Sequence, residues 1–426
     1  MTQLVRFSSV WSARIRDAYD ELGGREVDVS RFAFVADFLA SFDEHFGGAP
    51  DFELLATCDQ SCWLHDGRAV FFDVYQSAAI KSLLGGLTGG YPTFSHQVKR
   101  CLALALSHDE PGMSRAILDQ ASDNPAHHYR HHESTLEDGT RVLGALMRSI
   151  GREELFLVVD QFLLAHELFH FLVKAGDPIA TRNQQVVSTQ FDDIVGAVCY
   201  FRAPDFGDRL RRQTNASLSE QAVENERQRQ QRQEASYQRN RHSLVEEIAC
   251  DWFAFNTISS SFGLTFFSKH DPLEVYSRFL QIAFLVMSVI NLHQAMLKRA
   301  LLVASGAPSS EAPDDLSDMH LRLTSMIFVA ATCHPISKQL GDSDEGEQLH
   351  GELLAQCNLL IGPLKTAFDA CVLFPTTNSV AECLRGIVDR RGATSDAVRA
   401  SVEPEEVFDR AVLEAVFRQS GDEGRS

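Results

Sequence analysis

The chain has 426 residues, of which 44% are hydrophobic and 23% charged, as is typical of a globular protein with a large core. The formal net charge of −19 argues against a nucleic acid as the primary partner and against an anionic membrane surface, because both need a basic surface. The nine cysteines, an odd number spread over the chain, indicate free thiols and not a disulfide framework, and the first residues lack the apolar core of a signal peptide. We therefore expect a cytoplasmic protein.

Two segments are apolar enough to be tested as membrane spans, residues 155–173 and 282–290. The first contains acidic residues and histidines that would be costly in lipid. The second is much shorter than the roughly 20 apolar residues that a span needs. We expect both segments to be buried helices, and we expect no membrane span.

The N-terminal part of the chain changes from helical to strand-like patterning. Apolar residues recur every three to four positions over residues 10–22 and 31–46, which predicts two helices. Two β-rich segments, residues 52–57 and 69–75, flank the turn signal Asp66-Gly67 and predict a pair of strands.

The glycine-rich segment at residues 85–92 predicts a loop, and from about residue 95 onward the chain is predicted to be mostly helical, except for a loop over residues 122–140. Residues 217–241 are exceptional because they consist mostly of Gln, Glu, Arg, Asn and Ser and contain no Gly or Pro. This composition predicts either a solvated helix or a mobile insertion. Its arginines suit nucleic-acid phosphates, but the interspersed glutamates and the acidic net charge favour a solvated surface.

The segment His166-Glu167-Leu168-Phe169-His170 carries the clearest chemical signal. On a helix, residues four apart lie on one face, so both imidazoles can reach one ion. Zinc accepts neutral imidazole nitrogen, and Glu167 between the two ligands is placed to take a proton from the attacking water. The alternative is a pair of core histidines satisfied by the backbone. The surrounding helix over residues 156–171 is strongly apolar, and unpaired polar side chains are costly there, which favours the metal site.

A third ligand is expected on the amphipathic helix predicted over residues 242–254. Ser243 followed by Glu246 has the spacing of a capping box, which assigns Glu246 to the helix start. Glu247 is then the candidate zinc ligand, and Asp251, one turn later, can accept a hydrogen bond from a ligating histidine. The alternatives are an ordinary solvated acidic face and Cys250 as a soft ligand.

The two segments together resemble the gluzincin metallopeptidases, in which two histidines and a downstream glutamate bind zinc. His166-Glu167-x-x-His170 followed by Glu247-x-x-x-Asp251 is similar to the motifs of ImmA/IrrE-type regulatory peptidases, Lit-like phage-exclusion peptidases and soluble HtpX-type peptidases. The HtpX-type peptidases also carry a later His-Pro motif, which His334-Pro335 matches. The arginine that usually follows that motif is replaced here by leucine.

The resemblance implies a zinc metalloendopeptidase that cuts a specific intracellular protein, in a regulatory or defence-related role. Zn²⁺ would be held by His166, His170 and Glu247, with Glu167 as general base and His334 as the candidate that steadies the oxyanion. The alternative function is a zincin-like binding or sensor module without turnover. An intact Glu167 favours the enzyme, because a pure binding site needs no base at that position.

The expected fold is α+β and predominantly helical: a zincin-like catalytic core with a small N-terminal sheet, and a helical second lobe. We expect four parts in chain order: an N-terminal lobe with the sheet and the metal-binding helix, a polar insertion, a helical lobe with the third ligand, and an acidic tail. Their boundaries are residues 1–205, 206–241, 242–390 and 391–426.

Overall fold

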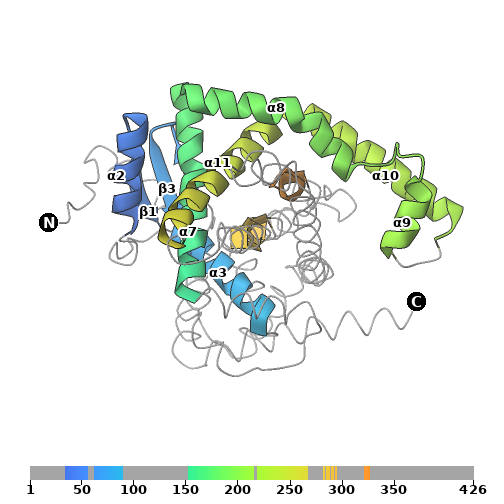
Figure 1. Ribbon diagram of the computed structural model, residues 1–426, viewed down its shortest axis with the longest axis horizontal. Helices are drawn as coiled ribbons and strands as arrows, with labels where there is room; N and C mark the ends of the chain where they lie inside the picture. The colour runs from blue at the N-terminus through green and yellow to red at the C-terminus, as the bar shows by residue number, and fades with distance from the viewer. Residues whose placement is uncertain are drawn as a thin grey trace, which may run out of the picture. The chain divides into compact units, whose positions relative to one another are not determined.

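A computed structural model (Figure 1) describes most of the segments on which these expectations depend. The described residues are 34–55, 62–89, 152–214, 218–266, parts of 282–294, and 321–326. They are mostly helical with one three-stranded sheet, which confirms the α+β, predominantly helical class. The helix predicted over residues 10–22, the acidic tail and His334 lie outside the described residues. Among the described residues, those up to Phe171 and those from 285 to 294 form one compact unit, and the others form a second.

The sheet of the first unit consists of β1 (Asp51–Leu55), β2 (Trp63–His65) and β3 (Ala69–Asp73), in the order β1-β3-β2. β3 pairs in parallel with β1 and antiparallel with β2, and all five of its residues are buried, as expected for a central strand. Both predicted strands are therefore confirmed. The turn at Asp66-Gly67, where φ is 51° and 67°, joins β3 to β2, a three-residue strand that the sequence analysis did not predict.

Helix α3 (Val74–Gly89) begins directly after β3. Asp73 starts it, because its Oδ1 accepts a hydrogen bond of 2.7 Å from the backbone N–H of Tyr75. The loop predicted from residue 85 is wrong over its first part, since the helix continues to Gly89. Glycine costs a helix about 1 kcal/mol, and here the buried side chains of Ala79, Ile80 and Leu84 stabilise it through packing.

Helices α2 (Phe34–Phe46) and α7 (Arg152–Ala175) confirm two further predictions over the described residues. They pack together through Phe42 and Phe171, whose ring centroids are 6.4 Å apart. Within the described part of the chain, one helical segment, Leu155–Ala175, is long and apolar enough to cross a membrane, and 61% of its most apolar window is buried in the protein. Core helices of soluble proteins have the same properties.

A buried polar cluster joins α3 to α7 in the first unit. Asp160 on α7 accepts a hydrogen bond of 2.5 Å from Ser77 Oγ and pairs with Lys81 Nζ. Asp160 is 5% exposed, and burial raises the pKa of its carboxyl, although Lys81 acts in the opposite direction. The cluster fixes α3 against the first half of α7, the helix that carries both histidines further on.

The described residues of the second unit include the helices α8 (Pro178–Val198), α9 (Phe206–Thr214), α10 (Glu220–Arg239) and α11 (Arg241–Phe266). Helix α8 starts at Asp177, whose side chain accepts a hydrogen bond from the N–H of Ile179. Helices α8 and α11 pack against each other. Arg241 joins them, because it pairs with Asp192 at 2.8 Å and lies over the ring of Phe191.

Helix α10 accounts for most of the polar segment 217–241, so the prediction of a solvated helix is confirmed. It starts at Ser219, whose side chain accepts a hydrogen bond from the N–H of Ala222. Val223 packs on Phe206 of α9. The arginines of this region pair with neighbouring acids, as in Arg229–Glu226, Arg202–Glu234 and Arg211–Asp208. Paired arginines give less free positive charge to a phosphate backbone than the composition alone suggests.

Candidate metal centre

Helix α7 places His166 and His170 on one face, one turn apart. Their ring centroids are 5.1 Å apart, and the ring planes make an angle of 74°. His166 is 9% exposed and His170 is half-buried. The helical period therefore brings the two imidazoles together as the sequence predicts.

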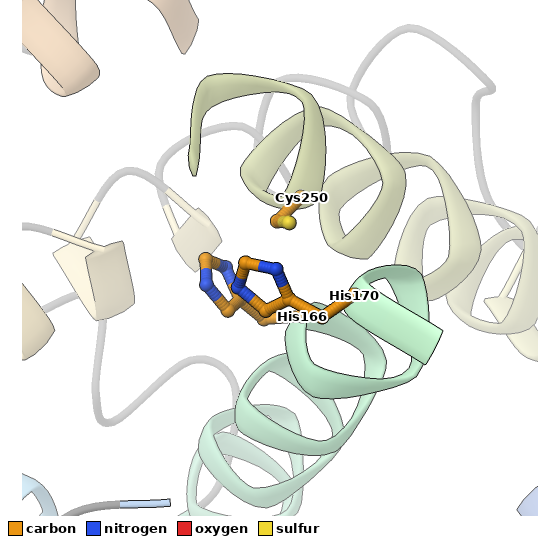
Figure 2. Close-up of side chains that lie close together, drawn as sticks. All are labelled: His166, His170 and Cys250. Atoms are coloured by element: carbon orange, nitrogen blue, oxygen red, sulfur yellow. The ribbon is translucent and has the colours of Figure 1, made fainter. Parts of the chain in front are cut away.

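The residue that completes a group with them is Cys250 on α11. One ligand atom from each of His166, His170 and Cys250 lies within 4.8 Å of the other two. Figure 2 shows the two imidazoles projecting from α7 toward the thiol of Cys250. Cys250 is completely buried. These three residues form a group that could hold a metal ion.

The donor set suits a borderline-soft divalent ion. Imidazole nitrogen and thiolate sulfur are the ligands that zinc prefers, with bonds of about 2.0–2.1 Å and 2.3 Å. In a tetrahedral site such bonds place the ligand atoms roughly 3.3–3.6 Å apart. The observed limit of 4.8 Å exceeds this by about 1 Å. Small side-chain rotations can close that difference, so the residues fit the ion.

Glu167 lies between the two histidines on α7 and is half-buried. Its negative charge acts on the thiol of Cys62, which stands directly before β2. Burial and, next, the charges of Glu167 and Asp73 raise the pKa of Cys62 well above its usual range. Cys62 therefore stays a neutral thiol, and its Sγ accepts a hydrogen bond of 3.2 Å from the N–H of Asp73.

The two carboxylates that the sequence singles out on α11, Glu247 and Asp251, both contact the guanidinium of Arg322. Both oxygens of Asp251 accept hydrogen bonds of 2.6 Å from Arg322. A terminal nitrogen of the same guanidinium lies 3.6 Å from Oε2 of Glu247. The charges of Asp251 and Glu247 raise the pKa of Arg322 and outweigh the opposing effect of its burial, so it is a permanent cation.

The sequence and the structure thus favour different residues of α11 as the third ligand. The group of ligand atoms contains Cys250 and not Glu247, although Glu247 stands only one turn earlier. The roles of Glu247 as a ligand and of Asp251 as a hydrogen-bond acceptor for histidine stay predictions. So does the role of His334, which lies outside the described residues.

The predicted capping box at Ser243 and Glu246 is wrong. Helix α11 begins at Arg241, and the N–H of Leu244 already donates to the carbonyl of Asn240 at 3.0 Å. Ser243 is therefore the third residue of the helix and cannot cap it. The helix starts earlier than predicted, with Asn240 in the N-cap position, because its carbonyl accepts the first hydrogen bond of the helix and asparagine is a favoured N-cap residue.

Arg322 is the residue that sequence reasoning missed. It stands 71 positions from Asp251, and an isolated arginine in a helical pattern gives no signal of a distant partner.

Comparison of the chain with known protein families, with curated proteins and with solved structures finds no match. The chemistry of the site residues is therefore the basis for a function.

Proposed function

We propose that the chain is a zinc metalloendopeptidase that cuts a specific intracellular protein, in a regulatory or defence-related role. One observation carries the proposal: the convergence of His166, His170 and Cys250 beside Glu167. The likeness of the two sequence motifs to gluzincins supports it, and a zincin-like core is part of the proposal.

The ligand set favours zinc among the divalent ions. Two imidazoles and a thiolate are too soft a set for Mg²⁺ or Ca²⁺, which take oxygen ligands. When bound by three protein ligands, zinc supplies a Lewis acid that polarises a carbonyl and makes a bound water acidic near neutral pH. Two residues are candidates for the third ligand: Cys250, which lies close to both histidines, and Glu247, which the gluzincin likeness implies.

Glu167 performs the proton transfers in this proposal. As a carboxylate it takes the proton of the attacking water, and it then gives that proton to the leaving amine. Its position between two ligands of one helix keeps the carboxylate next to the reacting water. The neighbouring Cys62 does not compete as a base, because its raised pKa keeps it protonated.

The test is the variant Glu167→Gln, which keeps size and hydrogen bonding but cannot accept the proton. We expect zinc content and fold to be unchanged, and proteolysis to fall by about 10²–10⁴, the usual contribution of a general base. New protein N-termini in cells that produce the wild type, compared with cells that produce the variant, reveal the substrate. Glu246→Gln is the matched control, since this half-buried carboxylate of α11 has no assigned role.

Two outcomes would contradict the enzyme. If purified protein contains no stoichiometric metal, the site is not a metal centre. If zinc is bound but the wild type and Glu167→Gln give the same set of N-termini under every growth and stress condition tried, the chain is a zincin-like binding or sensor module.

A further inference from the structure

We infer that Arg322 selects the third metal ligand: it holds Glu247 and Asp251 and so leaves Cys250 to complete the site with His166 and His170. This inference rests on the proposed metal site, but not on peptide hydrolysis. It assigns a positioning role to Arg322 and predicts which class of metal ion the site accepts.

The contacts of Arg322 show why it can restrain carboxylates. Its Nε and one terminal nitrogen donate to the two oxygens of Asp251 at 2.6 Å, a bidentate arrangement. The other terminal nitrogen is then turned toward Glu247, at 3.6 Å from Oε2. One guanidinium therefore engages both carboxylates along one turn of α11.

Burial makes this arrangement strong and specific. The side chain of Asp251 is completely buried and that of Arg322 is 8% exposed, whereas that of Glu247 is 35% exposed. In a buried environment, charge-assisted hydrogen bonds are less screened, and leaving one partner unpaired is costly. The buried Arg322–Asp251 pair therefore fixes the guanidinium, and the remaining terminal nitrogen of Arg322 faces Glu247.

The segment that carries Arg322 is itself attached to α11. Ser325 Oγ donates to the carbonyl of Arg322 at 2.6 Å, and the indole Nε1 of Trp252 lies 3.4 Å from the same hydroxyl. The guanidinium therefore has a defined position along α11, which a flexible surface arginine would lack.

The sequence Glu247-x-x-Cys250 places both candidate ligands on neighbouring positions of one helical face. The positive charge of Arg322, 3.6 Å from Oε2 of Glu247, opposes the approach of a cation to that carboxylate, whereas Cys250 lies within 4.8 Å of both histidines. The site should therefore bind ions that tolerate thiolate, such as Zn²⁺ and Co²⁺, and should discriminate against Mn²⁺, which prefers carboxylate oxygen.

Co²⁺ is the probe, because a bound thiolate gives a sulfur-to-cobalt charge-transfer absorption in the near ultraviolet. The full chain is stripped of metal under reducing conditions and titrated with Co²⁺. We expect the absorption in the wild type and in Glu247→Gln, and its loss in Cys250→Ser. If the wild type lacks the absorption, or if Glu247→Gln loses cobalt while Cys250→Ser retains it, the inference is overturned.

The role of Arg322 is tested by Arg322→Lys, which keeps the charge but loses the bidentate fork. Release of Glu247 should raise the affinity for Mn²⁺ by about 10–100-fold, the range typical of changes around metal ligands. The double variant Arg322→Lys with Glu247→Gln should lose this gain. An unchanged Mn²⁺ affinity in a folded Arg322→Lys protein would refute the positioning role, as would a gain that persists in the double variant.

The test remains decisive if Arg322→Lys does not fold, because Glu247→Gln and Cys250→Ser alone decide the ligand. It is also separable from the proposed function. If the wild type lacks the sulfur-to-cobalt absorption but its proteolysis depends on Glu167, only the inference is contradicted. If the wild type shows the absorption but proteolysis does not depend on Glu167, only the enzyme is contradicted.

Discussion

The variant Lys81→Met removes the cation of the buried cluster in the first unit and leaves Asp160 without its countercharge. Removing one partner of a buried ion pair costs about 3–5 kcal/mol. The side chain of Lys81 is 16% exposed and that of Asp160 is 8% exposed, so solvent screens the pair slightly. Ser77 also still donates to Asp160. We therefore expect a loss near the lower end, about 3 kcal/mol, in the free energy of unfolding.

The cost should depend on pH in a direction that follows from the pKa of Asp160. Burial raises this pKa in the folded protein above the unfolded value of about 3.9. Stability contributed by the carboxyl is therefore fully present below about 3.9 and is lost as pH rises through the folded pKa. In Lys81→Met the folded pKa rises further, because Lys81 lowers it in the wild type. The difference in the free energy of unfolding between the wild type and Lys81→Met should thus increase with pH.

Urea unfolding, followed by circular dichroism at several pH values, measures both effects. Asp160→Asn and the double variant complete a mutant cycle. In the Asp160→Asn background the Lys81 substitution should cost less than about 1 kcal/mol, since no buried carboxylate remains to be paired. A cost that is the same at every pH, or the same in both backgrounds, would refute the role assigned to the ion pair.

Two further predictions concern the second unit. Ser219→Ala should destabilise α10 by about 0.5–2 kcal/mol, because the N–H of Ala222 loses its capping acceptor, and thermal unfolding checks this. Burial, together with the charge of Glu234, raises the pKa of Cys199 to about 12, so iodoacetamide at pH 8 should modify it about 10³-fold more slowly in the native protein than in urea. Peptide mapping by mass spectrometry measures the ratio, and equal rates would contradict the buried position.

The elements best predicted from the sequence are those whose signal is local. Helix α7 combines a long apolar run with His166 and His170 at helical spacing, so both the helix and the imidazole pair were predictable. Helix α3 was missed in part because glycines such as Gly85 and Gly86 usually end helices. In the structure, the buried side chains of Ala79, Ile80 and Leu84 stabilise this helix, although the helix propensity of glycine disfavours it.

The third ligand could not be decided from the sequence, because Glu247, Cys250 and Asp251 all lie on neighbouring positions of one helical face. What separates them in the structure is a contact with Arg322, 71 positions from Asp251 along the chain. Pairing over such a distance depends on tertiary packing, which periodicity does not encode. The same applies to the parallel pairing of β1 with β3, since a turn signal indicates only the adjacent strand.

The junction at Asn240 has a practical consequence. Helix α10 ends at Arg239 and α11 begins at Arg241, so a single residue separates the polar helix α10 from the helix that carries Cys250. A spin label or fluorophore on an exposed α10 position such as Gln231 would follow the orientation of α11 without a flexible loop in between. A label on this polar helix would therefore test whether α11 moves when metal binds, and it would leave the metal-binding residues unchanged.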